Sequence, residues 1–487
     1  MKIVFAASEM VPFAKTGGLG DVLGVLPGEV ASLGHEVAVF IPRYKRIDPA
    51  KWGLKLDIEP LIIPLGSEKE EGRIYSSKQE GGVTVYLVDH PGLFCRDELY
   101  GTAMGDYPDN DRRFIFFQRA VLEALRVMRL KPDILHCHDW QTGLIPVYLK
   151  TIYADDACFR KTKSVFSIHN LGYQGNFPPD SLSTTGLGWD QYRMERIEFY
   201  GKISFLKGAL LDADYIATVS ERYAKEILTK EFGCGMENVL AQRSDKVFGI
   251  LNGLDYREWD PARDLDIAEP YDPGSLDKKL KNKIALQKEN DFQADPRIPL
   301  IGMVSRLTED KGIDILLPVM NSLFDLGFQF VLLGTGDEKY HRIFRDLAKK
   351  KTGFCRAHIL FDAKMAKRFY AGCDMVLVPA HSEPCGLGPM IALRYGTIPI
   401  VRATGGLADS VQEFDPQTGE GTGFRFEEYS GESLAAALTR AAKAYANEKS
   451  WRQLVSRVMK LDFSWSACAR KYAKLYEAAG HSAPKKS

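Results

Sequence analysis

Several features that would place a protein in a special class are absent from this sequence. Lys plus Arg and Asp plus Glu each number 64, so no excess charge is present to attract nucleic acid or an anionic membrane. No run of about 18 apolar residues occurs, so we expect no membrane span. Repeats and low-complexity tracts are also missing. An anionic partner must therefore bind at a local site.

Cysteines are few and unclustered. The eight cysteines are scattered without a Cys-x-x-Cys pair. In a chain of this length, that pattern is typical of reduced thiols in a cytosolic protein. The first residues, MKIVFAASEM, already form a predicted strand and carry no cationic leader with a cleavage site. We therefore expect a cytoplasmic protein.

The composition is that of a globular protein of more than one domain. Hydrophobic residues make up 45% and charged residues 26% of the 487 residues, which excludes disordered and fibrous classes. A single hydrophobic core stops growing at about 250 to 300 residues. At least two domains are therefore expected.

Short β-branched runs recur along the chain, and each is followed by a segment with helical periodicity. The first series comprises Lys2–Ala6, Glu36–Ile41, Val83–Val88, Asp133–His136, Ser164–Ile168, Tyr215–Val219 and Val247–Leu251. The second comprises Leu300–Val304, Phe328–Leu333, Ala357–Phe361, Met375–Val378 and Ile398–Val401. Apolar strands that alternate with helices predict parallel sheets covered on both faces. Two series predict two doubly wound α/β domains.

The boundary between the domains is expected near Asn252–Pro261, where the strand pattern ends. We divide the chain into an N-terminal domain, residues 1–257, a C-terminal domain, residues 258–464, and a final amphipathic helix with a frayed tail, residues 465–487. The polar stretch Asp272–Pro299 is helix-prone and fits either edge of the division. Doubly wound domains bind ligands at the carboxyl ends of their strands. We therefore expect the site in a cleft between the domains.

A glycine-rich turn, Lys15–Asp21 (KTGGLGD), follows the first strand and opens a helix. Gly17, Gly18 and Gly20 allow the backbone to approach a ligand, and the helix N-terminus offers N–H groups to an anion. A tight structural turn explains the same residues. A nicotinamide site would need an acidic residue at the end of the second strand, which is followed instead by Pro42-Arg43.

His136-Cys137-His138-Asp139 follows another predicted strand and supports two interpretations. A His-x-His pair can ligate zinc or iron. Alternate residues of a strand share one face, however, so both histidines can simply pack beside a cleft. Asp139 can face a developing positive charge or cap the helix that follows. A superficially metal-binding Asp-x-Asp, Asp212 to Asp214, precedes a strand and is interpreted as a solvated loop.

Other polar clusters also stand where strands end. His169–Gly175 combines polar, aromatic and glycine residues that suit sugar hydroxyls. Arg306 and Lys311 can clamp a diphosphate from one side. His381–Pro389 places Glu383 before a helix start, where it can reach a sugar hydroxyl while the N-terminus meets phosphate. Thr404–Asp409 repeats the pattern of a strand, two glycines and a helix. A structural loop is the alternative for His169–Gly175, and solvated side chains are the alternative for Arg306 and Lys311.

Six motifs occur in the order KTGGLGD, HCHDW, HNLGYQG, VSRLTEDKG, HSEPCGLG and TGGLADSV. In this order and spacing they resemble the motifs of bacterial glycogen synthases and plant starch synthases, which are retaining glucosyltransferases. The resemblance runs from Lys2 to about Tyr476, and the lack of a transit peptide favours the bacterial enzymes. It implies an α/β fold of the GT-B type, with two Rossmann-like domains facing an interdomain cleft. It also implies transfer of glucose from ADP-glucose to the non-reducing end of an α-1,4-glucan such as glycogen, without a metal or another cofactor.

The resemblance also implies roles for particular residues. Arg306 and Lys311 would bind the diphosphate and stabilise the departing ADP. Glu383 would hold hydroxyls of the donor glucose. Asp139 and His169 match residues that line this glucose and support its oxocarbenium-like state.

Further matched positions would bind the substrates. Tyr100 belongs to a loop that resembles the acceptor-side loop of the family. Phe361 stands where a Tyr usually stacks on adenine, so the stacking face is kept and the hydroxyl is lost. The remaining matched positions are Lys15, Gly17, Gly18, Asp21, Asn252, Cys385, Gly386 and Leu387.

Two departures from the family pattern bear on mechanism. Gly388-Pro389 stands where Thr-Gln is usual, which removes a hydroxyl but leaves the helix start intact, because Pro suits the first helical turn. Ile391 stands where the wider superfamily often has a second Glu. Because the motif holds one carboxylate, we favour same-face attack within an ion pair over a covalent glucosyl-enzyme.

Other functions fit parts of the sequence. A related transferase could use UDP-glucose. A metal-dependent hydrolase could be built on His136 and His138. A non-catalytic carbohydrate-binding protein would not need Arg306 and Lys311.

Overall fold

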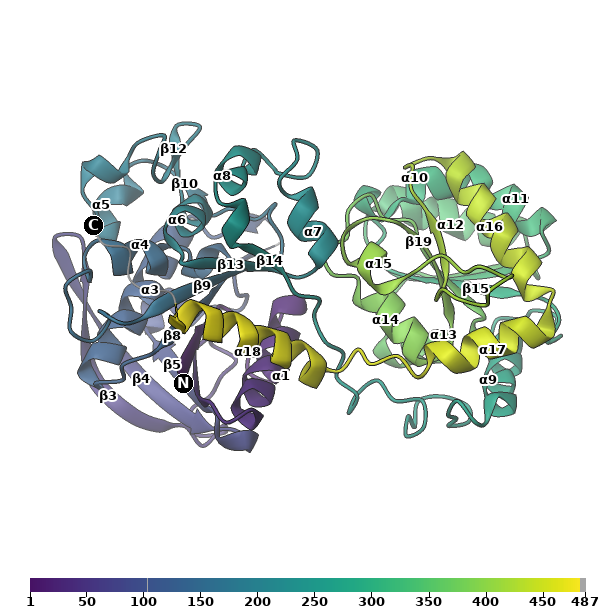
Figure 1. The fold of residues 1–487 in the computed structure, drawn as a ribbon, viewed down its shortest axis with the longest axis horizontal. Helices are drawn as coiled ribbons and strands as arrows, with labels where there is room; N and C mark the ends of the chain where they lie inside the picture. Colours follow the sequence, from purple (N-terminus) through teal and green to yellow (C-terminus); the bar gives the residue numbers. More distant parts are fainter. Residues whose placement is uncertain (103, 482–487) are drawn as a thin grey trace. The chain divides into compact units, whose positions relative to one another are not determined.

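The computed structural model describes residues 1–102 and 104–481, which form two compact units (Figure 1). Unit 1 comprises Met1–Val219, Ala224–Gly253 and the described residues from Trp465 onward. Unit 2 comprises Ser220–Tyr223 and Leu254–Ser464. Most of the tail expected to fray lies outside the described residues.

Unit 1 is built on a nine-stranded sheet in the order β14-β13-β9-β8-β1-β2-β5-β4-β3. Its strands are β1 (Lys2–Ala6), β2 (Glu36–Pro42), β3 (Lys55–Leu65), β4 (Glu68–Lys78), β5 (Thr84–Asp89), β8 (Ile134–His138), β9 (Lys163–Ile168), β13 (Tyr215–Thr218) and β14 (Val247–Gly249). From β14 to β5 every pairing is parallel, which confirms the doubly wound prediction. The first series of predicted strands is present, and no strand end is shifted by more than two residues.

The structure has an antiparallel hairpin at the sheet edge that the sequence did not predict. Strand β3 pairs antiparallel with β4, and β4 with β5. Strand β4 reads EKEEGRIYSSK, and several of its residues are exposed. The apolar runs that reveal buried parallel strands do not occur in a strand with one solvated face. Gly66 turns the hairpin with φ 60°, and an added Cβ there would lie 2.1 Å from the Ser183 carbonyl oxygen.

The helices of this part of the chain cover the sheet, and short strands form two small sheets beside it. The helices are α1 (Gly18–Ser32), α2 (Pro91–Phe94), α3 (Asn110–Val127), α4 (Leu144–Lys150), α5 (Ser181–Thr185), α6 (Phe205–Asp212), α7 (Glu221–Glu226), which contributes to both units, α8 (Glu237–Ala241) and α18 (Trp465–His481). The short strands are β6 (Gly101–Thr102), β7 (Gly105–Asp106), β10 (Asn176–Phe177), β11 (Glu198–Phe199) and β12 (Lys202–Ser204). The 3-10 turns of the whole chain are η1 (Glu80–Gly82), η2 (Trp140–Thr142), η3 (Trp189–Gln191), η4 (Ser244–Lys246), η5 (Glu309–Lys311) and η6 (Leu317–Val319).

The C-terminal helix α18 returns to unit 1, although it follows unit 2 in sequence. Figure 1 shows it in yellow alongside α1. The Tyr476 hydroxyl lies 2.8 Å from Nδ1 of His136 on β8. An added Cβ at Gly253 would lie 2.5 Å from the Cα of Trp465. The last helix therefore completes the packing of the first unit.

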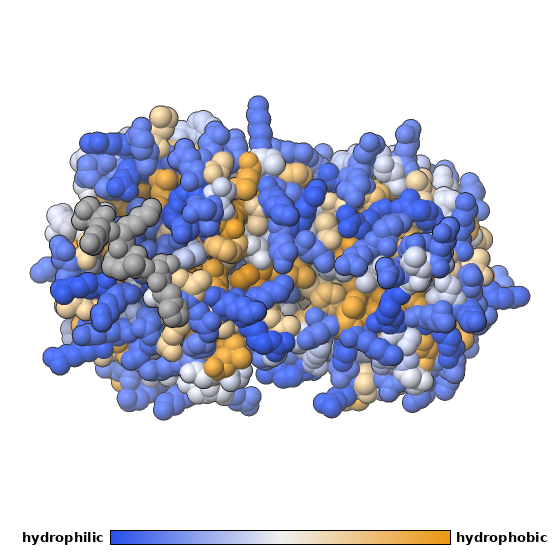
Figure 2. All heavy atoms as spheres, in the orientation of Figure 1, coloured by the Kyte–Doolittle hydropathy of each residue, from blue (hydrophilic) through white to orange (hydrophobic). Residues whose placement is uncertain are grey.

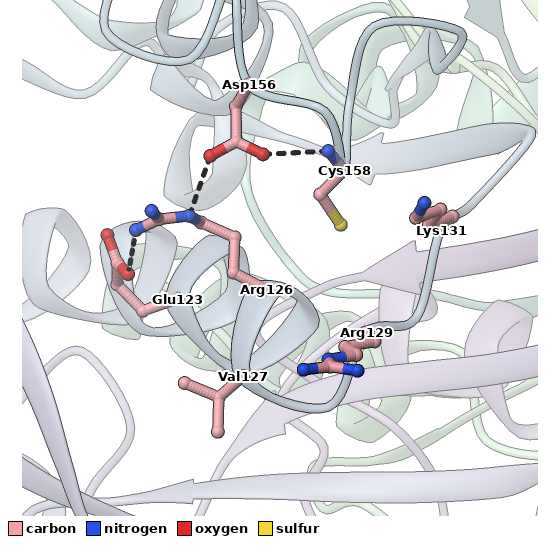
Figure 3. A pocket seen from close by; sticks show the side chains of 7 residues that line it. All are labelled: Glu123, Arg126, Val127, Arg129, Lys131, Asp156 and Cys158. Carbon is pink, nitrogen blue, oxygen red and sulfur yellow. Dashed lines mark hydrogen bonds and ion pairs between the residues drawn. The ribbon is translucent and has the colours of Figure 1, made fainter.

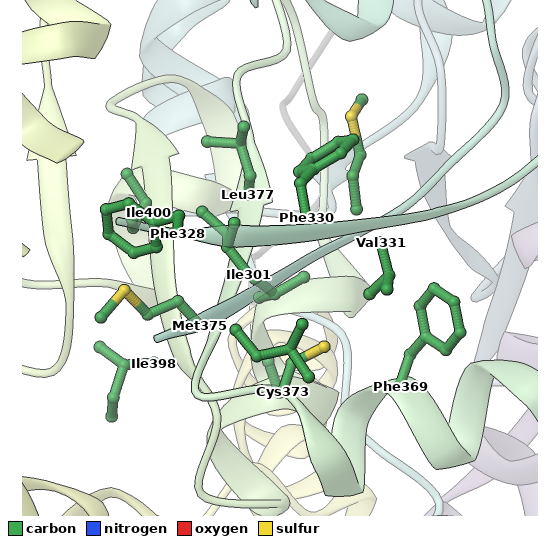
Figure 4. Packing of buried hydrophobic residues seen from close by; sticks show 14 of the residues in the cluster. Ile301, Phe328, Phe330, Val331, Phe369, Cys373, Met375, Leu377, Ile398 and Ile400 are labelled. Carbon is green, nitrogen blue, oxygen red and sulfur yellow. The ribbon is translucent and has the colours of Figure 1, made fainter. Parts of the chain in front are cut away.

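Unit 2 contains a six-stranded parallel sheet in the order β17-β16-β15-β18-β19-β20. Its strands are β15 (Leu300–Val304), β16 (Gln329–Leu333), β17 (Cys355–His358), β18 (Met375–Val378), β19 (Ile398–Arg402) and β20 (Phe424–Phe426). Its helices are α9 (Leu276–Glu289), α10 (Ile313–Leu316), α11 (Met320–Asp325), α12 (Glu338–Lys350), α13 (Ala363–Gly372), α14 (Leu387–Arg394), α15 (Gly405–Ser410), α16 (Gly431–Tyr445) and α17 (Glu448–Val458). Figure 4 shows the apolar side chains packed on the sheet, among them Ile301, Phe330 and Phe369.

The polar stretch that fitted either edge forms α9 and belongs to unit 2. Two of its lysines are buried. Lys279 donates to the Ala371 carbonyl at 2.9 Å, and Lys283 pairs with Asp374 at 2.7 Å. Burial lowers the pKa of Lys279 to about 8. The charges that made the segment look peripheral in fact attach it to the end of α13 and to the residue before β18.

The interpretation of Asp212 to Asp214 as a solvated loop is wrong. Asp214 accepts from the backbone N–H of Ser164 at 2.8 Å, and it pairs with Lys150 at 3.0 Å. The carboxylate therefore joins the start of β9 to the end of α4.

The surface agrees with the balanced composition. Figure 2 shows a face on which hydrophilic side chains predominate. Within the described residues, no helix has the length and hydropathy needed to cross a membrane.

Candidate active site

The glycine-rich turn after β1 holds the first of the expected site residues of unit 1. Lys15 pairs with Asp21 at 2.6 Å, and both side chains are partly exposed. An added Cβ at Gly17 or Gly18 would meet no atom within 4 Å, so open space borders the backbone there. Gly20 differs, because its Cβ would lie 3.0 Å from the Lys15 side chain. This third glycine is needed for packing within the turn.

A buried carboxylate that the sequence analysis missed, Glu9, organises this turn. Glu9 is 3% exposed. It accepts from the Thr16 backbone N–H at 2.6 Å, from the Thr16 hydroxyl at 2.7 Å and from the Gly17 N–H at 3.2 Å. It also accepts from the Tyr100 hydroxyl at 2.7 Å. The signal in the sequence was weak, since a lone Glu after a strand has no motif around it.

Tyr100 is therefore held by protein groups. Its hydroxyl lies 2.7 Å from Glu9 and 2.7 Å from the Ser8 hydroxyl. Desolvation raises its pKa well above the ordinary value, so it remains a neutral donor. Through Glu9, the Tyr100 hydroxyl joins its own loop to the glycine-rich turn.

The contacts of Glu9 lead to a testable prediction. Glu9→Ala should speed amide exchange at Thr16 and Gly17 and weaken ligand binding at this turn roughly tenfold, because hydrogen bonds to a charged group are lost. Glu9→Gln should preserve most of both, since one amide oxygen can accept the two backbone N–H groups and the hydroxyls can reorient. Glu36→Ala, an exposed pair with Lys2, is the matched control. Unchanged exchange in Glu9→Ala would contradict this role.

Asp139 lies directly after β8 with an unusual backbone. Its φ of 55° falls in the left-handed region, which is costly for a residue with a side chain. Its side chain caps no helix, so the N-cap interpretation is wrong. The carboxylate instead accepts from the backbone N–H of His169 at 2.8 Å. Desolvation raises the pKa of Asp139 to about 7, the His169 N–H opposes that rise, and the charge of Glu9 adds to it.

The two histidines of β8 are fully buried and have protein partners. Nδ1 of His136 lies 2.8 Å from the Tyr476 hydroxyl, and its Nε2 lies 2.7 Å from the Ser167 hydroxyl. Nδ1 of His138 lies 2.9 Å from Nε2 of His169. Across residues 1–102 and 104–481, no group of three or more His, Cys, Asp or Glu side chains could hold a metal ion. Both ring nitrogens of His136 are used by the fold, so the packing interpretation suits this pair better.

Asn252 is 7% exposed at the end of unit 1. Its side-chain oxygen is buried and has no hydrogen-bond partner among the described residues. An unpaired buried oxygen is costly, so a ligand that donates to it would be favoured.

In unit 2, the loop after β15 brings two cations beside a carboxylate. Lys311 pairs with Glu383 at 2.9 Å and with Asp310 at 3.3 Å. Desolvation lowers the pKa of Lys311, but the two carboxylates outweigh it and the pKa lies above its ordinary value. Arg306 is more exposed and lies 3.7 Å from Asp310. Gly312 allows this approach, since its Cβ would lie 2.0 Å from the Pro379 carbonyl oxygen.

The segment around Glu383 leads into α14, as the sequence predicts. Gly386 precedes the helix with φ 75°, and Leu387 is its first residue. Pro389 occupies the first turn without ending the helix, which confirms that Gly388-Pro389 leaves the helix start intact. A side chain would fit at Gly388, because its Cβ would lie 3.4 Å from the Tyr370 hydroxyl.

The glycine pair of the last motif packs against this segment. An added Cβ at Gly405 would lie 2.0 Å from the Glu383 carbonyl oxygen, and one at Gly406 would lie 1.6 Å from that of Cys385. The Gly406 N–H donates to the Glu383 carbonyl at 3.0 Å. These glycines therefore permit two loops to touch and so hold the Glu383 backbone in place.

Phe361 lies outside the strand in which the sequence places it. Strand β17 ends at His358, and Phe361 precedes α13, where Asp362 caps the helix by accepting from the Met365 N–H at 2.9 Å. The run was extended too far because Ile359, Leu360 and Phe361 are apolar. The Phe361 side chain is 86% exposed, so its ring face is open to a ligand.

A pocket of about 570 Å³ lies elsewhere, at the end of α3 (Figure 3). It is lined by Glu123, Arg126, Val127, Arg129, Lys131, Asp156 and Cys158. Arg126 is already paired with Glu123 and with Asp156. None of the predicted site residues lines this pocket.

Comparison with known protein families finds two matches that together cover most of the chain. Residues 2–242 match the family described as starch synthase catalytic domain. Residues 286–455 match the family described as glycosyl transferases group 1. The unmatched stretch between them, residues 243–285, contains the boundary between the units at Gly253 and Leu254.

Whole-chain relatives are found among curated proteins. A glycogen synthase of Geotalea daltonii is 46% identical over 476 residues, which is 98% of each chain. A glycogen synthase of Koribacter versatilis is 45% identical over 479 residues and 98% of each chain.

Solved structures give the same correspondence. The catalytic domain of starch synthase IV from Arabidopsis thaliana, bound to ADP and acarbose, superimposes with a TM-score of 0.87, at 34% identity and 99% coverage of both chains. A sucrose-phosphate synthase from Thermosynechococcus elongatus matches with a TM-score of 0.59 at 18% identity and 98% coverage of both chains, which shows a likeness of fold.

Proposed function

Because the chain belongs to the glycogen and starch synthase family of glycosyltransferases with the GT-B fold, we propose that it transfers glucose from ADP-glucose to the non-reducing end of an α-1,4-glucan. The single observation that supports this most directly is the 34% identical starch synthase bound to ADP and acarbose, since it matches over 99% of this chain. The product is a glycogen-like glucan, and we place the reaction in the cytoplasm.

The chemistry of the reaction assigns work to the cations of unit 2. The bond between the anomeric carbon and the phosphate oxygen breaks, and its electrons leave with ADP. Lys311 and Arg306 offset the negative charge that develops on the diphosphate. In the structure Lys311 pairs with Glu383 at 2.9 Å, so its charge is already held beside the group that we assign to the donor hydroxyls. The backbone of Cys385 to Leu387 completes the phosphate side.

The residues of unit 1 act on the glucose and the acceptor. Glucose develops positive charge as ADP departs, and the Asp139 carboxylate offsets it. The acceptor hydroxyl attacks the face that ADP leaves and gives its proton to the departing phosphate oxygen. Configuration is thereby retained without a covalent intermediate. His169 and Asn252 hold the sugar, and Lys15 and Asp21 hold the nucleotide side with Gly18. Phe361, which belongs to unit 2, stacks on adenine.

The backbone N–H of Gly17 is not available to the ligand. The Gly17 N–H is already donated to Glu9 at 3.2 Å. We therefore assign to Gly17 close approach of its backbone to the ligand, for which there is open space, and assign donation of an N–H to the residues that follow.

The experiment that tests the proposal is a donor competition on a glucan primer. ADP-glucose should be used in preference to UDP-glucose and GDP-glucose, and transfer should persist after exhaustive chelation, because the cationic side chains perform the neutralisation that a metal would otherwise provide. Preference for UDP-glucose would overturn the donor assignment. A loss restored by zinc or manganese would favour the site at His136 and His138. Binding of glucan without transfer from any of the donors would favour a carbohydrate-binding protein.

A further inference from the structure

The pair formed by His138 and His169 contains an unmet hydrogen-bonding group. His138 is fully buried, and its Nδ1 lies 2.9 Å from Nε2 of His169. The centroids of the two rings are 5.2 Å apart, and the angle between their planes is 27°. The other nitrogen of His138, Nε2, is buried and has no partner among the described residues. The proton on each ring can be deduced from this arrangement.

Both rings are neutral near neutral pH. Burial lowers the pKa of His138 well below its ordinary value and that of His169 to about 4. The titratable groups that act on His138 are His136 and His169, and both oppose its charging. Each ring therefore carries one proton, and one of the two nitrogens that meet must be the donor.

The unpartnered Nε2 of His138 decides whether His138 or His169 donates the hydrogen bond between them. If His169 donated from Nε2, the proton of His138 would stand on its own Nε2, where no acceptor is present. In protein interiors, an N–H without an acceptor is rarer than an acceptor with an unused lone pair. The proton of His138 therefore stands on Nδ1 and is donated to His169. This leaves Nε2 of His169 as the acceptor and puts its proton on Nδ1.

The neighbouring histidine cannot change this outcome. The ring of His136 lies 4.1 Å from that of His138, but its two nitrogens are bonded to Tyr476 and Ser167. It therefore offers His138 packing and no hydrogen bond.

We infer that His138 is a positioning residue that fixes His169 as the tautomer protonated on Nδ1, so that His169 presents an N–H donor to an oxygen of the sugar. The part of this inference that concerns the sugar rests on the proposed function. The part that concerns the tautomer does not, because it follows from the buried contacts of the free protein.

The direct test is nitrogen NMR of the free protein labelled on its histidine rings. The signals of His169 are assigned by their loss in His169→Gln. They should show a protonated Nδ1 and an unprotonated Nε2, and His138→Phe should allow the ring of His169 to exchange between tautomers. His138→Asn should restore the fixed tautomer, because its amide nitrogen stands near the position of Nδ1. A His169 protonated on Nε2 in the unmodified protein would overturn the inference.

Kinetics separate positioning from a structural role. His138→Phe should lower kcat about tenfold, the effect of one lost hydrogen bond, with a smaller change in KM, and His138→Asn should recover most of it. Tyr476→Phe is the matched control, because it removes the hydroxyl bonded to His136 and leaves His169 untouched. It should lower the melting temperature without moving the His169 signals. Equal losses of kcat in His138→Phe and Tyr476→Phe, or an unchanged tautomer in His138→Phe, would overturn the inference. If no donor supports transfer, the proposed function fails, whereas the tautomer is still measured.

Discussion

Replacing Lys311 with alanine should lower kcat about a hundredfold while changing KM much less. The reason is that its ammonium group offsets the negative charge that develops on the diphosphate only as ADP leaves. The Lys311 side chain is only 15% exposed, so in the alanine variant water stabilises the charge of the leaving ADP poorly in its place. The change also leaves Glu383 without its partner at 2.9 Å. Steady-state kinetics with ADP-glucose measure both constants.

Two variants show whether the position of the charge matters. Lys339→Ala is the matched control, because Lys339 is 55% exposed and lies 3.7 Å from Glu309 in the same region of unit 2. It should have near-normal kinetics. Arg306→Ala should resemble Lys311→Ala in its effect on kcat, although Arg306 is more exposed. A Lys311→Ala enzyme with normal kcat and only a raised KM would show that Lys311 binds substrate without assisting the departure of ADP.

Replacing Asp139 with asparagine should lower kcat/KM by about a hundredfold or more at pH 8, since a carboxylate that faces the developing positive charge is lost. In the unmodified protein, activity should fall as the pH drops below about 7, because desolvation raises the pKa of Asp139 to about 7 and only the ionised form stabilises positive charge. The remaining activity of Asp139→Asn should lack this acidic limb. The measurement is kcat/KM across pH.

Stability should depend on pH in the opposite sense. The pKa of Asp139 is raised from 3.8 to about 7 on folding, so between these values the folded protein binds more protons than the unfolded chain. The free energy of unfolding should therefore decrease as the pH rises through this interval, and Asp139→Asn should remove that contribution. Asp133→Asn is the matched control at the other end of β8, where Asp133 accepts from the Lys2 N–H in an exposed position. For the activity prediction, an acidic limb of kcat/KM that persists in Asp139→Asn would mean that another group controls the pH dependence of activity.

The sequence by itself determined the parallel strands of the two sheets and the motif residues that follow them. Runs such as Leu300–Val304 and Met375–Val378 are apolar throughout, because a strand covered on both faces has no polar side. Lys311 and Glu383 were recognisable for the same reason, since parallel strands direct the loops after them to one edge of a sheet. Their ion pair follows from that topology.

The tertiary structure alone decided the contacts that orient these residues. Glu9 has no motif, and its role appears only when Thr16, Gly17 and Tyr100 converge on one carboxylate. The tautomer of His169 depends on a lone nitrogen of His138, and the His136 beside it is bonded to Tyr476, which is 340 positions away in the chain. Residue patterns report which side chains are buried and where strands end, because these depend on neighbours in sequence. Hydrogen-bond partners and the desolvation that raises the pKa of Asp139 depend on neighbours in space, and only the folded chain brings those together.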